Sequence, residues 1–245
     1  MFTATLLPAR ATTLVTGDIN TADIDSKLLG FKGRGAPPPG ERTSGGTRGD
    51  CPDTDGQSLI ALVPEHTYGE TISEHPTLWF YVPYTADQVA RGEFSLQDEN
   101  GDNIAESVPF TLPNDVPGFV SITLPEVFAL ETVGDDYQWY FELYCIPNGS
   151  PVSVYGWIQN VGELPELEDQ LNQANTPEDV VFAEHLIWFD AVNSLAELRA
   201  QDAESSELTE RWNQLMTAEE VFLQDLPEAS FVGSVRLETS EPVAD

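Results

Sequence analysis

The stretch YQWYFELYC, residues 137–145, decides the fold class of this chain. Successive side chains of a β-strand point to opposite faces, so alternate residues share a face. The more apolar set consists of Tyr137, Trp139, Phe141, Leu143 and Cys145. The opposite set consists of Gln138, Tyr140, Glu142 and Tyr144. This alternation predicts a strand that turns one face to a hydrophobic core.

Short runs of the same kind lie on both sides of this stretch. They cover residues 58–63, 77–82, 93–97, 104–112, 119–124 and 152–161. Turn-forming residues separate them, and Asn100-Gly101 between two alternating runs is a strong signal for a tight hairpin. Seven short strands without intervening helices predict a mainly β chain, with an antiparallel β-sandwich over residues 51–162 that is immunoglobulin-like in a loose sense.

The sequence outside residues 51–162 has a different character. After Gly162 the apolar period changes from two to about 3.6, which predicts a C-terminal α-helical extension over residues 163–226, packed on the sandwich. One continuous helix is expected from Pro177 to about Arg199. Residues 1–50 are rich in Gly, Pro and Arg and are expected to be a flexible N-terminal segment. Residues 227–245 are expected to be a disordered tail.

The charge of the chain excludes several classes of partner. The sequence has 42 acidic and 10 basic residues, a formal net charge of -32. Residues 1–50 carry six bases and five acids, so the excess negative charge lies in the remainder. Such a surface repels phosphate backbones and anionic lipids, so we expect no nucleic-acid partner. No apolar stretch has the length of a membrane-spanning helix, so we expect no membrane insertion.

Motifs that would indicate catalysis or metal binding are incomplete. Asp98, Asn100 and Asp102 resemble part of a calcium loop, but Gly101 is fourth where such a loop needs its glycine sixth, so a hairpin turn is favoured. His185 has no second histidine four residues away, as a zinc-binding helix requires. No serine lies in a G-x-S-x-G motif. We therefore expect no catalytic residue, no metal site and no cofactor.

Six aromatic residues lie on the sides of their strands opposite the expected core. They are Trp79, Tyr81, Tyr140, Tyr144, Tyr155 and Trp157. A face of flat rings can stack on sugars or on peptide partners, so these residues form the candidate binding face. The alternative is that the amphipathic helices after Gly162 cover it, because their apolar stripe must be buried against something.

The chain contains two cysteines, Cys51 and Cys145. An even number is compatible with one disulfide and an oxidising compartment, while two buried thiols in a reduced protein are the alternative. The N-terminal sequence MFTATLLPARATTLVTG lacks a basic segment before its apolar residues, so it does not fit a signal peptide. A cytoplasmic location, or an export signal missing from this start, therefore stays open.

Several motifs together resemble a known family. In order they are GGTRG-x-CP (45–52), ALVP (61–64), PTLWFYVP (76–83), YQWYFELYC (137–145), VYGWIQ (154–159) and AEHLIWFDAVNSLAEL (183–198). Over residues 43–225 the chain resembles the cyanobacterial domain of unknown function numbered 928. The resemblance implies an exported protein, periplasmic or extracellular, without an established activity or catalytic residues. It also implies a disulfide between Cys51 and Cys145, which lie in two of the shared motifs.

These observations lead to two functional hypotheses. The first is a non-enzymatic, exported or envelope-associated interaction domain with a protein or glycan partner. The alternative is an envelope enzyme that acts on polysaccharide through paired carboxylates, whose spacing would have to match that of glycosidases.

Overall fold

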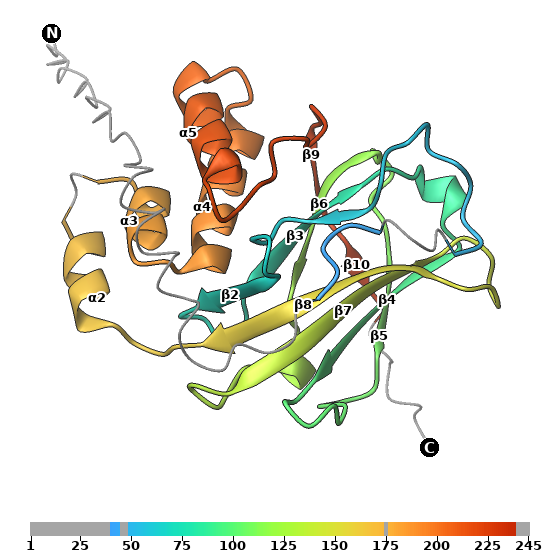
Figure 1. Cartoon of the computed structure of the whole chain (residues 1–245), viewed down its shortest axis with the longest axis horizontal. Helices are drawn as coiled ribbons and strands as arrows, with labels where there is room; N and C mark the ends of the chain where they lie inside the picture. Colours follow the sequence, from blue (N-terminus) through green and yellow to red (C-terminus); the bar gives the residue numbers. More distant parts are fainter. Residues whose placement is uncertain (1–39, 45–48, 174–175, 239–245) are drawn as a thin grey trace, which may run out of the picture.

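The computed structural model describes residues 40–44, 49–173 and 176–238. These residues form two β-sheets and four α-helices, so the fold is mainly β (Figure 1). The expected flexible segment, residues 1–50, lies mostly outside the described residues. The immunoglobulin-like character of the sandwich stays a prediction.

The two sheets contain four and six of the described strands. The first sheet has the order β1-β3-β6-β9, with bounds Ile60–Ala61, Thr77–Val82, Gly118–Thr123 and Phe231–Ser234. The second has the order β10-β5-β4-β7-β8-β2, with bounds Arg236–Leu237, Val108–Thr111, Arg91–Gln97, Asp136–Tyr144, Val152–Asn160 and Tyr68–Thr71. Antiparallel pairs dominate, but β2 runs parallel to β8, and β9 runs parallel to β6. The short helices η2 and η3 cover Ala86–Gln88 and Glu126–Phe128.

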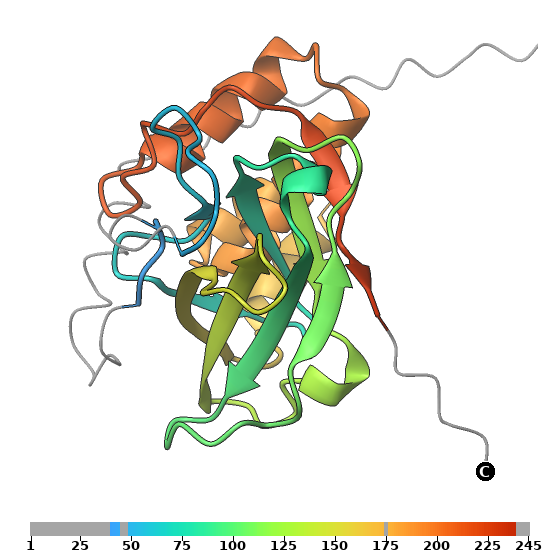
Figure 2. The same cartoon turned by 90° about the vertical axis from the view of Figure 1, so that its right-hand side faces the viewer.

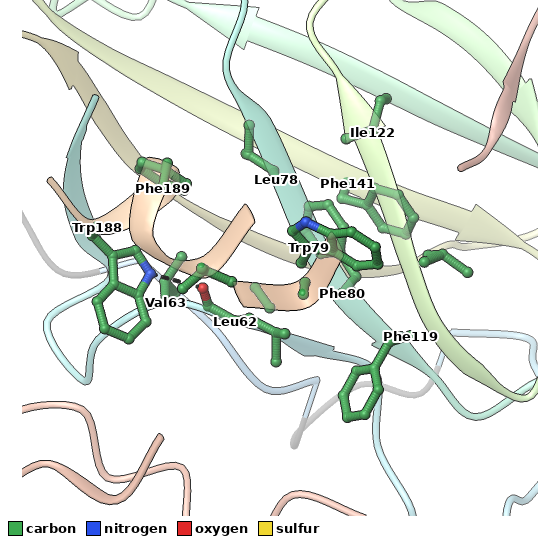
Figure 3. Close-up of a cluster of buried hydrophobic side chains, with 14 of the residues drawn as sticks. Leu62, Val63, Leu78, Trp79, Phe80, Phe119, Ile122, Phe141, Trp188 and Phe189 are labelled. Carbon is green, nitrogen blue, oxygen red and sulfur yellow. Dashed lines mark hydrogen bonds between the residues drawn. The ribbon is translucent and has the colours of Figure 1, made fainter. Parts of the chain in front are cut away.

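Aromatic contacts join the two sheets face to face. The ring of Phe80 in β3 stacks on that of Phe141 in β7, with centroids 4.0 Å apart (Figure 3). Phe80 also meets Trp139 edge-on, with centroids 5.7 Å apart. Phe141 and Trp139 belong to the apolar set of the stretch 137–145, and both are fully buried. The strict alternation of burial along β7 therefore confirms the strand and its core face.

The strands β3 and β6 are buried on both faces. Five consecutive residues of each are buried, because the second face of this sheet is covered by helices. The helices are α2 (Pro165–Leu171), α3 (Glu178–Glu184), α4 (Trp188–Gln201) and α5 (Ser206–Thr217). Phe119 in β6 meets Trp212 of α5 edge-on at 5.8 Å. Packing on this face therefore produces a second aromatic core outside the sandwich.

The helices are not a C-terminal extension, because the chain returns to the sheets after α5. Phe231–Ser234 forms β9 beside β6, and Arg236–Leu237 forms β10 beside β5. Val235 between them is buried. The expectation of a disordered tail is therefore wrong for residues 231–237, since these few side chains bury apolar surface on both sheets. Residues 239–245 lie outside the described residues.

A second crossing between the sheets lies at the opposite edge. Glu41 bridges to Tyr155 of β8, and Thr43 bridges to Ile60 of β1. Between them, Arg42 donates to the carbonyl oxygens of residues 63, 221 and 222. Residues 40–44 are thus packed, in contrast to the flexible segment expected there. The two crossings pair backbone groups that an open sheet edge would leave exposed.

Two local expectations need correction. The helix expected from Pro177 to Arg199 is interrupted, because Leu186 has a φ of 63° and α4 starts anew at Trp188. The hairpin turn at Gly101 is present, with a φ of 82°, but the following strand begins only at Val108. Ile104, which was expected on the core face, is 40% exposed.

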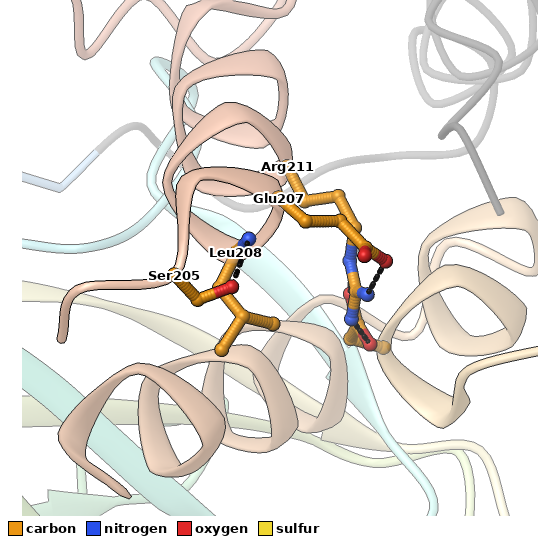
Figure 4. A network of polar contacts seen from close by, with 5 residues as sticks. Ser205, Glu207, Leu208 and Arg211 are labelled. Carbon is orange, nitrogen blue, oxygen red and sulfur yellow. Dashed lines mark hydrogen bonds and ion pairs between the residues drawn. The ribbon is translucent and has the colours of Figure 1, made fainter. Parts of the chain in front are cut away.

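A buried ion pair joins α5 to α3. The Arg211 guanidinium donates through Nε to Asp179 Oδ2 at 3.0 Å and through Nη2 to Asp179 Oδ1. Arg211 also contacts Glu207 one turn earlier, and Ser205 caps α5 by accepting from the Leu208 amide (Figure 4). Burial is the main cause that raises the pKa of Asp179, and the facing guanidinium opposes it.

Candidate functional site

The structure divides the six predicted aromatic residues between two faces. Trp79 and Tyr81 lie on the helix-covered side of β3, with 6% and 2% of their surface exposed. Trp79 donates through Nε1 to Asn193 Oδ1 of α4 at 2.9 Å. The other four residues, Tyr140, Tyr144, Tyr155 and Trp157, belong to β7 and β8 of the six-stranded sheet. The six aromatic residues, which were expected to form one face, therefore lie on two different sheets. Trp79 and Tyr81 are core residues and do not belong to a binding face.

The outward side of the six-stranded sheet is the candidate site, and we call it the open face. Its defining residues alternate with the core residues of β2, β4, β7 and β8: Tyr68, Glu70, Arg91, Glu93, Ser95, Gln97, Asp136, Gln138, Tyr140, Glu142, Tyr144, Ser153, Tyr155, Trp157 and Gln159. In the described structure the main helix–strand contacts are those of α4 with β2, β3 and β9. Figure 1 shows the helices to the left of and above the region where β4, β5 and β7 extend. Figure 2 shows α5 above the same strands.

Two tyrosines form a stacked pair at the centre of the open face. Tyr140 and Tyr155 are directly opposite in the register of β7 and β8, and their ring centroids are 5.3 Å apart at 20°. Both side chains are partly exposed. Tyr140 donates its hydroxyl to Gln138 Oε1 at 2.9 Å. Trp157 lies on the same face but is only 7% exposed, so the tyrosine pair is the more accessible aromatic surface.

A guanidinium is held at one end of the open face. The Arg91 guanidinium carbon lies 3.8 Å from the centroid of the Tyr144 ring, and Arg91 forms an ion pair with Glu93. Glu142 lies opposite Glu93 in the strand register and accepts from the Tyr144 hydroxyl at 3.4 Å. Burial, together with the negative charge of Glu93, raises the pKa of Glu142. Burial and the same two carboxylates raise the pKa of Tyr144 to about 12.

A group of acids lies at the other end, where β2 joins β8. Gln159 is opposite Glu70 on one side and Asp136 on the other, and its Nε2 donates to Asp136 Oδ1 at 2.9 Å. Burial and the charge of Asp136 raise the pKa of Glu70 to about 7. Asp136 accepts a hydrogen bond from Tyr68, and burial raises the pKa of Asp136 as well. At neutral pH, Glu70 is therefore divided between its protonated and ionised forms.

The disulfide between Cys51 and Cys145 is confirmed. Their sulfur atoms are 1.95 Å apart and their Cα atoms 5.0 Å apart. Cys145 directly follows β7, so the bond ties the residue after the longest alternating strand to the segment that leads into β1. This connection lies at the Tyr144 end of the open face.

Other candidate sites receive no support from the described part of the chain. Asp98 accepts from the amides of Asn100 and Asp102 at 2.9 Å, so its carboxylate caps the turn. Within residues 40–44, 49–173 and 176–238, no group of three His, Cys, Asp or Glu side chains is arranged to hold a metal ion. The helices in these ranges are all too short or too polar to cross a membrane.

Sequence reasoning did not assign several residues of this site. Tyr68 and Glu70 lie in β2, a four-residue strand whose sequence YGET gives little alternation to detect. Parallel pairing with β8, which is far away in the sequence, brings them to the open face. Arg91 was also missed, although its place two residues before Glu93 in an alternating run puts both on one face.

Comparison with known proteins gives one family match. Neither the curated proteins nor the solved structures contain a match to this chain. The family model described as Domain of Unknown Function (DUF928) matches residues 43–231, which include both sheets up to the first residue of β9. Since this match spans more than half of the sequence, the chain belongs to the DUF928 family.

Proposed function

We propose that this protein is a non-enzymatic interaction domain, exported or associated with the cell envelope, that binds a protein or glycan partner on the open face. The observation that carries the proposal is the partly exposed, stacked pair of Tyr140 and Tyr155. Aromatic rings supply contact area at small entropic cost, and the neighbouring Gln138 and Glu142 add groups that form directed hydrogen bonds. The two packed sheets, an immunoglobulin-like sandwich in the loose sense, hold these side chains on a rigid support.

The disulfide supports the proposed location. Disulfides persist in oxidising compartments and are rare in reducing ones. Cys51 and Cys145 are paired, and the described residues contain no free cysteine. Thiol titration of unreduced, denatured protein from its native compartment should detect no free thiol. Two free thiols there would contradict the proposed export.

Capture from envelope fractions tests the function. Wild-type protein is compared with a Tyr140→Ser/Tyr155→Ser variant, and with a control carrying Val127→Ser and Ile104→Ser, at exposed positions outside the open face. Retained proteins and sugars are identified by mass spectrometry. We expect the same partner with wild type and control and its loss from the tyrosine variant. Equal retention by all three proteins would contradict binding on the open face.

The acidic end of the open face favours a second candidate, an enzyme that cleaves polysaccharide. A glycosidase needs one carboxylic acid that stays protonated near neutral pH and a second, ionised carboxylate nearby. Glu70, with its pKa raised to about 7, and its neighbour Asp136 offer such a pair. Release of reducing ends by wild type and not by Glu70→Gln would establish this activity. Equal release, or none, would leave the binding function as the better proposal.

A further inference from the structure

On the open face one cationic side chain, Arg91, contacts a tyrosine ring and a carboxylate. The same two kinds of group, a tyrosine ring and a carboxylate, occur a second time on this face. Arg91 rests on the ring of Tyr144 at 3.8 Å and pairs with Glu93. Both charged side chains remain partly exposed, with 35% and 24% of their surface accessible. A guanidinium over an aromatic ring beside a carboxylate gains from both the ring quadrupole and the charge. Arg91 is therefore an example, within the protein itself, of a guanidinium bound by a tyrosine ring and a carboxylate of this face.

The second set of these groups has no cation of its own in the described structure. Tyr140 lies two residues before Glu142 on the same side of β7, and Tyr155 stacks on Tyr140. Glu142 thus lies between the rings of Tyr140 and Tyr144 along the strand. The residues that define the open face include four carboxylates and a single guanidinium, that of Arg91, so negative charge is in excess. The centre of the face has rings and a carboxylate, Glu142, whose charge Arg91 offsets only in part because Arg91 also pairs with Glu93.

The charge of the whole protein favours the same class of ligand. A net charge of -32 attracts basic segments over several ångströms and raises their rate of association. It repels acidic glycans and nucleic acids. Burial and the charge of Glu93 raise the pKa of Glu142, and a bound cation would relieve this unfavourable ionisation.

We infer that the open face binds an arginine-containing basic segment of a partner protein, with one guanidinium against Tyr140 and Tyr155 and its charge opposite Glu142. The inference rests on the proposed function, because it names the ligand class of the same face. Arginine fits better than lysine because its planar group stacks on rings and pairs with a carboxylate at the same time. The bound arginine repeats the arrangement of Arg91, Tyr144 and Glu93.

The test is calorimetric titration of the full chain with an acetylated, amidated peptide in which arginines alternate with glycines. Salt near 150 mM limits diffuse attraction to the acidic surface. Two variants probe the site: Tyr140→Ala/Tyr155→Ala, which keeps the net charge, and Glu142→Gln. Glu204→Gln, at an exposed position between α4 and α5, removes the same charge elsewhere. We expect about tenfold weaker binding for each site variant and a change of less than about twofold for the control.

Several outcomes would overturn the inference. Equal weakening by Glu142→Gln and Glu204→Gln, with no effect of the tyrosine changes, would mean diffuse charge attraction only. Tighter peptide binding after Lys27, Lys32 and Arg34 are replaced by serine would assign the face to the chain's own basic segment.

A neutral probe separates this inference from the proposed function. Binding of cellohexaose that is lost in Tyr140→Ala/Tyr155→Ala, without binding of the peptide, would refute the basic segment and leave the open face as a glycan-binding surface. Unchanged capture of envelope partners by the tyrosine variant would refute the proposed function itself.

Discussion

The outer faces of the two sheets differ, although both carry aromatic side chains. On the four-stranded sheet, Trp79 and Tyr81 are buried, and each contacts another ring, Phe231 and Phe119 respectively. On the six-stranded sheet, Tyr140 and Tyr155 lie among Gln, Glu and Ser side chains and remain partly exposed. An aromatic residue that points away from the sandwich core is therefore not by itself evidence of a binding surface.

The neighbours of the aromatic residues explain this difference. In β3 the sequence TLWFYV is apolar at successive positions. Covering either face of this strand therefore removes apolar surface from water, which stabilises the fold. In β7 each outward aromatic alternates with an outward polar residue such as Gln138 or Glu142. A helix packed there would bury charged groups without partners, at a cost of several kcal/mol. The helices therefore pack on the four-stranded sheet and against Gly69 and Thr71, which lie on the other side of β2 from the open face.

The largest expected effect is a difference in stability between the two faces. Trp79→Ala should lower the free energy of unfolding by about 3–5 kcal/mol, because it leaves a cavity and removes the donor to Asn193 Oδ1. Tyr140→Ala should cost less than about 1.5 kcal/mol, since its ring is partly solvated. Urea unfolding of both variants measures the difference. If Trp79→Ala does not fold, Trp79→Phe gives the same ranking with a smaller loss. Equal losses would mean that the two faces are equally buried.

The disulfide provides the second test. Cys51 and Cys145 are separated by 94 residues, and closing so long a loop restricts the unfolded chain. A Cys51→Ser/Cys145→Ser variant should lose about 2–4 kcal/mol of unfolding free energy. Because the bond lies at the end of β7, amide hydrogen exchange should increase more in β7 than in α4. An equal increase in both elements would mean that the bond stabilises the fold only through the unfolded state.

These two effects also show what the sequence predicts and where it fails. The alternation in 137–145 was sufficient to predict β7 and its two faces, because period two is a local property. The family resemblance implied the disulfide, which the structure confirms. Alternation alone did not predict the division of the aromatic residues, because successive side chains point to opposite faces in both β3 and β7; the unbroken apolar run of β3 is what distinguishes the two strands. The placement of residues 231–237 in both sheets depends on pairing with β5 and β6, more than 100 residues earlier.

A third test uses the pH dependence of stability at the acidic end of the open face. The pKa of Glu70 is raised from 4.5 to about 7, so the folded protein holds a proton that the unfolded chain releases. This contribution to stability is complete below pH 4.5 and is lost as the pH rises to about 7. Glu70→Gln stays neutral, so it should become more stable than wild type by about 1–2 kcal/mol at pH 8, after allowance for solvent screening.

Thermal unfolding from pH 4.5 to pH 8 measures this effect, and Glu204→Gln is the exposed control. The advantage of Glu70→Gln should increase with pH and level off above about 7. A constant advantage at every pH would mean that the substitution acts through packing and not through the proton on Glu70.

The smallest expected effect concerns the stacked tyrosines. Tyr140 and Tyr155 are directly opposite in β7 and β8, and cross-strand aromatic pairs contribute about 0.5–1 kcal/mol beyond their separate contributions. A double-mutant cycle with Tyr140→Ala, Tyr155→Ala and the combined variant isolates this coupling in the free energy of unfolding. Trp79 and Tyr155, which lie on different sheets and different faces, provide a control pair that should show no coupling. A coupling near zero for the tyrosines would show that the rings do not hold each other in place. Binding would then have to order them, and the affinity for any ligand would be reduced by that cost.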